Sequence, residues 1–456
     1  MRPSLLVCLA LLFPGIGVAT AAESRPRLLV LTDIGGDPDD QQSMVRLLVH
    51  ANEFDIEGLI ASASGTPNEL KEKVTKPHLI REQLDAYAKV LPNLRKHADG
   101  FPDTDALHAV VKSGNPNRGL DFIGEGHDTD GSRHIIACAD RDDPRPLNIT
   151  IWGGQTDLAQ ALWRVRNDRG PAGFAEFQSR LRVFDIDDQD KIHDWLFAEF
   201  PDAVYVLSKA AKGKDERLGA SRGMYLTGDE ALTSLAWLDA HVRMNHGPLG
   251  ALYPPKTWTA PNPHGALKEG DTPSWFFFLP LGLGDPAHPE WGGFGGRYVK
   301  ESRGLFRDAQ DALDGNSDAR FGVSRWRPVF QNEFAARMDW CVADEFKQAN
   351  HPPVAVMNGD ATRDVLHLAA KPGTMVKLSA QGSTDPDGHT LKARWWLYRE
   401  AGTHEGGIAI DGAGTFDATL AIPADAAGKT LHVILELTDT GTPTLTRFRR
   451  AVIQVE

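Results

Sequence analysis

Short apolar runs alternate with segments of helical spacing over the first three quarters of the chain. Residues 27–31 form an apolar run, and residues 39–50 behind it have the 3.6-residue spacing of a helix. Similar runs followed by polar loops or helical spacing cover residues 147–152, 181–186 and 203–207. Strand, loop and helix in repetition predict an α/β domain with a parallel sheet. In such a sheet a ligand binds beyond the carboxyl ends of the strands.

The pattern changes near residue 350. His351-Pro352-Pro353 is typical of a stiff linker. Short runs with period two follow, and turns rich in Asp, Gly and Pro separate them; they cover residues 375–380, 392–398, 418–422, 431–437 and 447–455. This spacing predicts an immunoglobulin-like β-sandwich of about a hundred residues. We therefore expect an α/β domain over residues 26–348 and a β-sandwich over residues 353–456.

The first residues have the features of a secretory signal peptide. Arg2 precedes an apolar stretch over residues 5–12, and Ala19-Thr20-Ala21 is a typical cleavage site. The stretch is too short for a membrane span. We therefore expect residues 1–21 to be removed and the protein to be exported, to the periplasm or outside the cell.

Composition and charge narrow the classes of partner. Hydrophobic residues make up 41% and charged residues 24% of the 456 residues, which is typical of a folded soluble protein. The net charge of −13 argues against nucleic acid and against an anionic membrane surface as partners. It is compatible with a metal cation or a neutral sugar. Beyond the signal peptide the cysteines are Cys138 and Cys341, and residues so far apart are more often separate thiols, although export would permit a disulfide.

Four aspartates follow the first predicted strand within eight positions: Asp33, Asp37, Asp39 and Asp40. Carboxylates this close repel one another, and their pKa values rise unless a cation neutralises them. A hard cation with oxygen ligands resolves the repulsion, and Ca²⁺ takes six to eight of them. The alternative is that Asp39 or Asp40 caps the following helix, which explains one aspartate but not four.

This loop resembles that of the calcium-dependent nucleoside hydrolases, whose motif is Asp-x-Asp-Pro-Gly-x-Asp-Asp. It departs from the motif by Asp37-Pro38 before the pair. It is more similar to the nucleoside-hydrolase-like domain of exported bacterial proteins named as cellulose-binding. Short sequence motifs typical of that domain recur at residues 39–43, 52–59, 246–250 and 289–293. The resemblance covers about residues 27–345, and the closing β-sandwich fits the same two-domain family.

The resemblance implies a Ca²⁺ site built by the side chains of Asp33, Asp39, Asp40 and Asp271 and by the Trp152 backbone carbonyl. It also implies that Asp33 is the general base that activates water. Gly270 stands where the family has the histidine that is the usual candidate to protonate the leaving base. Without the resemblance, the sequence pattern predicts that Trp152 is a buried residue at the end of a strand and that Asp271 is a helix cap.

Substrate contacts are expected at the same carboxyl ends of the strands, and we call this opening beside the predicted Ca²⁺ site the mouth. In nucleoside hydrolases the segment after the third predicted strand holds ribose hydroxyls, which suggests roles for Asp187, Asp188, Gln189 and Asp190; the alternative is a solvated loop. His127 and Asp128 lie in another glycine-rich loop and are candidates to line the pocket, although a lone histidine is more often structural. Trp291 could stack on a sugar or could belong to a packed surface loop.

Two functions follow. The first is an exported hydrolase of N-glycosyl, nucleoside-like or related sugar substrates that uses a Ca²⁺-bound water activated by Asp33. The second is a non-catalytic carbohydrate-binding protein, for cellulose for example, that kept the hydrolase fold. The partner in either case is a small molecule or an oligosaccharide, including plant cell-wall polysaccharide. The four-aspartate loop and Asp271 favour the hydrolase, whereas Gly270 and the β-sandwich favour the binding protein.

Overall fold

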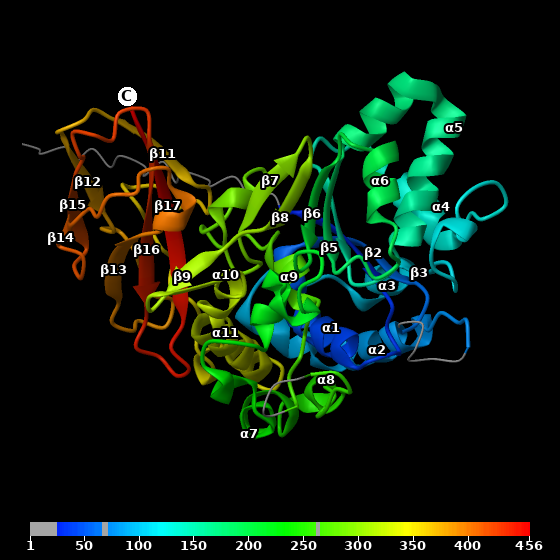
Figure 1. The fold of residues 1–456 in the computed structure, drawn as a ribbon. Helices are drawn as coiled ribbons and strands as arrows, with labels where there is room; N and C mark the ends of the chain where they lie inside the picture. Colours follow the sequence, from blue (N-terminus) through cyan, green and yellow to red (C-terminus); the bar gives the residue numbers. More distant parts are fainter. Residues whose placement is uncertain (1–24, 66–71, 261–264) are drawn as a thin grey trace, which may run out of the picture.

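A computed structural model describes residues 25–65, 72–260 and 265–456. The predicted signal peptide lies outside these residues. Figure 1 shows an α/β part formed by the first three quarters of the chain and a smaller part made of strands at the C-terminal end. None of the helices in the described ranges has the length and apolar character needed to cross a membrane.

The α/β part is built on one sheet of eight strands in the order β3-β2-β1-β4-β5-β6-β8-β7. Every neighbouring pair is parallel except β7 and β8. The strand order reverses between β1 and β4, which creates a crevice at their carboxyl ends. The predicted parallel-sheet α/β domain is therefore confirmed. The strands are β1 Arg27–Thr32, β2 Asp55–Ala61, β3 Val111–Ser113, β4 Leu147–Ile151, β5 Leu181–Ile186, β6 Val204–Ser208, β7 Tyr298–Ser302 and β8 Leu305–Asp308.

Helices cover both faces of this sheet. Along β1, Leu28 and Val30 belong to one hydrophobic cluster and Leu29 and Leu31 to another, which explains why the strand is an unbroken apolar run. The first cluster includes residues of α1, α2, α9 and α11, and the second those of α4, α5 and α6 (Figure 1). The helices are α1 Asp39–Val49, α2 Pro77–His97, α3 Thr104–Ala109, α4 Asp130–Ala139, α5 Gln155–Ser179, α6 His193–Glu199, α7 Leu235–Leu238, α8 Gly247–Ala251, α9 Thr272–Phe276, α10 Phe321–Ser324 and α11 Arg327–Trp340.

The C-terminal part consists of two facing sheets with strand orders β11-β17-β16-β13 and β12-β15-β14. Their buried faces share one hydrophobic cluster, which includes Leu378, Leu420 and Val433. The two cysteines among the described residues are free and buried in different clusters, Cys138 in the second and Cys341 in the first, so no disulfide joins them. The strands are β11 Leu366–Ala370, β12 Met375–Ser379, β13 Lys392–Leu397, β14 Ile410–Asp411, β15 Asp417–Ala421, β16 Thr430–Thr438 and β17 Thr446–Val455; the hairpin β9 Asp311–Leu313 and β10 Asn316–Asp318 precedes them.

The two parts pack against each other through a continuous apolar seam. Phe448 of β17 belongs to the same hydrophobic cluster as Phe294 and Trp326 of the α/β part. Ion pairs reinforce the contact, since the Arg447 guanidinium lies 2.6 Å from the Glu333 carboxylate of α11. The linker therefore joins two bodies that share a core.

Candidate functional site

Three buried carboxyl groups gather at the carboxyl edge of the sheet. Asp39 and Asp40 form the first turn of α1, and Asp271 directly precedes α9. One ligand oxygen from each lies within 4.8 Å of those of the other two. We call these residues the acidic triad. Helices α1 and α9 both begin at the same crevice. The short aspartate side chains at these helix starts therefore bring their oxygens together, although the residues lie far apart in the sequence.

Two members of the acidic triad, Asp40 and Asp271, form no ion pair with a lysine or arginine among the described residues, whereas Asp39 pairs with Lys268. Burial raises the pKa of Asp40 and Asp271 well above the usual range, and the neighbouring carboxylates, including Asp33, raise both further. Asp271 Oδ2 is buried without a hydrogen-bond partner. A divalent cation would satisfy this oxygen and remove the repulsion. Because all the donors are hard oxygens, the residues present fit Ca²⁺.

Three basic side chains pair with aspartates of the mouth, and one of these aspartates, Asp39, belongs to the triad. Arg118 Nη2 donates to Asp33 Oδ2 at 2.6 Å. Lys268 Nζ lies 2.8 Å from Asp37 Oδ2 and 2.9 Å from Asp39 Oδ2. Arg222 forms an ion pair with Asp187. Sequence reasoning missed all three, because Arg118 and Lys268 lie in loops and Arg222 in a short 3-10 helix, none of them with a motif, and only the fold brings them to the carboxylates.

Close backbone approach explains two glycines of the site. A Cβ atom at Gly153, just after β4, would lie 2.6 Å from the Asp33 Cγ atom. A Cβ atom at Gly270 would lie 3.2 Å from Asp39 Oδ2 and 3.2 Å from Arg222 Nη1. Gly153 therefore lets the segment after β4 pack directly against the Asp33 carboxyl group, and Gly270 leaves room for the Arg222 guanidinium and the Asp39 carboxylate.

The loop after β5 is held in an unusual backbone conformation. Asp187, Asp188 and Lys191 have positive φ angles of 71°, 52° and 58°. L-residues adopt this region rarely, and such residues concentrate at functional sites. Gln189 Nε2 donates to the Trp152 backbone carbonyl, which is the oxygen expected to contact Ca²⁺. The loop after β5 thus contacts the mouth through the hydrogen bond from Gln189 to Trp152.

The same loop contributes differently at each position. Asp190 accepts hydrogen bonds from Arg118 Nη1 at 3.1 Å and from the Thr156 backbone amide at 2.8 Å. Asp188 contacts His193 at 2.6 Å and Lys209 at 2.9 Å. These contacts lie in a neighbouring cleft of about 1040 Å³, whose lining includes all three side chains. Asp187, Gln189 and Asp190 therefore contact residues of the mouth, whereas Asp188 belongs to the cleft beside it.

Two family models match the chain. The model described as "Cellulose-binding Sde182, nucleoside hydrolase-like domain" matches residues 27–298, which is more than half of the chain. This chain belongs to the Sde182 nucleoside hydrolase-like family. The model described as "Cellulose-binding protein Sde0182, C-terminal domain" matches residues 375–455. The resemblance inferred from the acidic loop and the recurring phrases is therefore confirmed.

One solved structure agrees with the assignment to the Sde182 family. A nucleoside hydrolase-related hypothetical protein from Saccharophagus degradans, described as associated with carbohydrate metabolism, is 36% identical with a TM-score of 0.81; the match covers 95% of this chain and 100% of that one. The PKD domain from KIAA 1837 protein (17% identity, 20% of this chain and 81% of that chain, TM-score 0.16) and the titin M3 domain (20% identity, 23% and 96%, TM-score 0.15) are too distant to carry an argument. A comparison with curated proteins finds no match.

Three of the expected substrate residues of this Sde182-family chain lie apart from the acidic triad. Asp128 is held against α5 by Arg164, at 2.8 Å, and by Gln160 Nε2, at 2.6 Å. His127 packs edge-on against Phe122. Trp291 is 6% exposed and stacks on His288 in the seam between the two parts of the chain. Within the described ranges, none of the three contacts the triad. Glycine-rich or aromatic composition marked these loops, but composition does not specify which way a loop faces.

Proposed function

We propose that the α/β domain hydrolyses an N-glycosyl or related glycosidic bond in the crevice between β1 and β4. The observation that carries the proposal is the buried acidic triad with an unpartnered Asp271 oxygen. Membership of a nucleoside hydrolase-like family supports it. Asp33, Asp39, Asp40 and Asp271 would hold Ca²⁺, with the Trp152 carbonyl as a further oxygen ligand, because a carbonyl has two lone pairs and Gln189 uses one. Bound Ca²⁺ would position a water molecule and sugar hydroxyls and would lower the pKa of that water.

Asp33 is the residue proposed to take the proton from the attacking water. It directly follows β1, so the sheet holds it firmly. Arg118 anchors its Oδ2 atom, and the Gly153 backbone packs against its Cγ atom. A general base must be held within hydrogen-bond reach of the proton it removes, and these contacts restrict the carboxyl group to one orientation.

The remaining residues of the mouth would orient the sugar and stabilise the transition state. Glycoside cleavage passes through an oxocarbenium-like state with positive charge on the sugar, which the surrounding carboxylates stabilise. Asp187 and Gln189 would accept or donate hydrogen bonds to sugar hydroxyls. Arg222 lies beside Gly270, where it would hydrogen-bond to negative charge that develops on the leaving group. This proposal favours substrates whose leaving group departs without a strong acid.

A second candidate function is the binding of polysaccharide without catalysis. Two observations favour it: Gly270 has no side chain to supply a proton, and the Asp33 carboxylate is already engaged in an ion pair with Arg118. The family name refers to cellulose binding. In this case an exported protein would use the mouth or the seam to hold cell-wall polysaccharide outside the cytoplasm.

One experiment separates the two. Sugar release from nucleosides and oligosaccharides is measured with the full chain, first in excess Ca²⁺ and then in EDTA, in parallel with sedimentation on insoluble cellulose. Turnover that EDTA abolishes and Ca²⁺ restores supports the hydrolase. Cellulose binding without turnover on any substrate supports the binding protein. Asp128→Asn is the matched control, because this carboxylate lies outside the mouth.

A further inference from the structure

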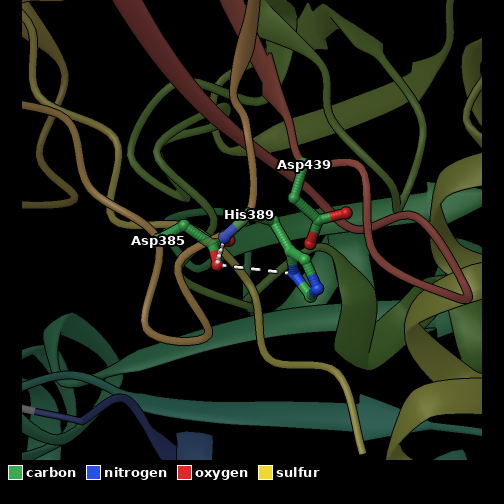
Figure 2. Close-up of side chains that lie close together, drawn as sticks. All are labelled: Asp385, His389 and Asp439. Carbon is green, nitrogen blue, oxygen red and sulfur yellow. Dashed lines mark hydrogen bonds and ion pairs between the residues drawn. The ribbon is translucent and has the colours of Figure 1, made fainter.

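A second cluster of potential metal ligands lies in the C-terminal part of the chain, remote in sequence from the acidic triad. Asp385 and His389 belong to the loop between β12 and β13, and Asp439 follows β16. One ligand atom from each lies within 4.8 Å of those of the other two. Figure 2 shows the two carboxyl groups pointing toward the His389 ring. His389 Nδ1 lies 3.5 Å from Asp385 Oδ1, beyond a good hydrogen bond.

Three buried polar atoms at this cluster have no hydrogen-bond partner. The Asp385 side chain is 1% exposed, and its Oδ2 atom is unpartnered. His389 Nδ1 is buried and unpartnered as well. Asn350, which donates from Nδ2 to Asp439 Oδ2 at 2.9 Å, keeps a buried Oδ1 atom without a partner. Buried polar atoms are nearly always paired, so their coincidence at one place indicates a ligand.

The charges around the cluster also favour a cation. Across the described parts of the chain, no lysine or arginine forms an ion pair with Asp385, Asp387 or Asp439. The basic partner of Asp387 is His351, whose Nδ1 atom lies 3.0 Å from Asp387 Oδ1. Burial lowers the pKa of His351, which disfavours its charged form. Among the described residues, these carboxylates therefore have no lysine or arginine to balance their charge.

We propose that Asp385, His389 and Asp439 bind a divalent transition-metal ion, for which Zn²⁺ is the probe. Two carboxylate oxygens and one imidazole nitrogen suit this class of ion, whereas the oxygen-only acidic triad suits Ca²⁺. The His389 side chain is 35% exposed, which leaves access for a water ligand. Backbone amides hold Asp385 in place, because its Oδ1 atom accepts from the amides of Asp387, at 3.0 Å, and of His389, at 2.9 Å.

The location suggests that the metal would strengthen the docking of the two parts. Asn350 belongs to the linker, and its backbone carbonyl accepts a hydrogen bond from Trp340 Nε1 of α11 at 2.9 Å. The next linker residue, His351, donates its amide to Asp387 Oδ2 at 2.7 Å. A bound ion would therefore tie two loops of the β part to the linker and, through it, to α11.

The test is a Zn²⁺ titration of the full chain by calorimetry in excess Ca²⁺, which occupies the oxygen-only site. We expect one Zn²⁺ equivalent for the wild type. Asp385→Asn, Asp439→Asn and His389→Gln should each weaken binding about tenfold or more. His404→Gln is the matched control, because His404 pairs with Asp425 at 3.2 Å in the same part of the chain but outside the cluster. It should bind Zn²⁺ as the wild type does.

Two outcomes overturn the proposal. One is a wild type that takes up no more Zn²⁺ than Asp385→Asn does, with native circular dichroism for both proteins in EDTA. The other is a visible absorption spectrum of the Co²⁺-loaded protein that His389→Gln leaves unchanged. Because His389 is partly exposed, this variant should fold even if the aspartate variants do not, and it keeps the test decisive.

Discussion

At the scale of single residues, the aspartates of the mouth divide by their partners. Asp33, Asp37 and Asp187 lie against Arg118, Lys268 and Arg222, so protein cations balance part of their charge. Asp40 and Asp271 have no such ion pair in the described part of the chain, and burial raises the pKa of both. The mouth thus combines three basic side chains, which pair with some of its aspartates, with one group of buried carboxylates suited to a metal ion.

The first prediction concerns Asp33. Asparagine keeps an oxygen for the metal and a similar shape, but it cannot accept a proton at neutral pH. Asp33→Asn should fold normally and lower glycosidase turnover by about two to four orders of magnitude, which is the usual contribution of a general base. Steady-state kinetics of Asp33→Asn and of the control Asp128→Asn check this. An active wild type with an Asp33→Asn rate within a few-fold would show that another group is the base.

A second prediction concerns Gly153. A Cβ atom there would approach the Asp33 Cγ atom to 2.6 Å, so Gly153→Ala must displace the carboxyl group or the strand end. We expect a loss of about 1–3 kcal/mol in stability together with weaker Ca²⁺ binding. Gly414→Ala is the control, because a Cβ atom at Gly414 meets nothing within 4 Å. Thermal melts and Ca²⁺ titrations of the two variants should differ; equal behaviour would contradict the proposed packing.

At the scale of elements, the carboxyl ends of the strands collect buried acids beyond the mouth itself. Asp308 ends β8, and burial raises its pKa to about 7. Its Oδ2 atom accepts a hydrogen bond from the Ala220 amide at 2.8 Å. Because the folded state holds this proton more tightly than the unfolded chain does, the contribution of Asp308 to stability is fully present below about pH 4 and is lost as the pH rises toward 7.

The third prediction follows from that sign. Replacing Asp308 with asparagine removes the titrating group but keeps the acceptor oxygen. The wild type should lose up to about 4 kcal/mol of unfolding free energy from this group between about pH 4 and pH 7. Asp308→Asn should therefore show a flatter stability curve over that range. Urea unfolding at a series of pH values measures it, and identical curves for the two proteins would contradict the raised pKa.

The elements also show what the sequence could predict. The runs along β1, β4 and β5 were predicted because a parallel strand buried on both faces is apolar throughout. β11 and β14 were missed, since β11 has exposed positions and β14 has two residues. The aspartates of the acidic triad stood out through an acidic loop and a family resemblance. Arg118, Arg222 and Lys268 did not, because single basic residues in loops or in a short 3-10 helix have no spacing that predicts a site.

At the scale of the whole molecule, the two parts on either side of the Pro-rich linker share a core at the seam. Phe448 of the β part is 2% exposed and packs against Phe294 and Trp326 of the α/β part. Glu333 is flanked by Arg337 and Arg447, which hold its pKa well below the usual range. We therefore expect the two parts to unfold together rather than in sequence.

The fourth prediction tests this coupling. Phe448→Ala opens a cavity in the seam and should cost about 3–5 kcal/mol. Calorimetry of the Phe448→Ala variant should show either one unfolding transition at a lower temperature or two separated unfolding transitions. Leu378→Ala is the comparison, because Leu378 packs in the cluster between the two sheets of the β part. A wild type that already unfolds in two well-resolved steps, with only the second changed by Phe448→Ala, would show that the seam does not couple the parts.

The most direct test of the account is whether the acidic triad binds Ca²⁺. Calorimetric titration of metal-free full chain should give one Ca²⁺ equivalent, and Asp271→Asn, which removes the charge behind the unpartnered oxygen, should weaken it by about tenfold or more. Asp128→Asn should leave the affinity unchanged. If the folded wild type binds no Ca²⁺, or if Asp271→Asn binds it as tightly as the wild type does, then the triad is not a calcium site and the proposed hydrolase is wrong.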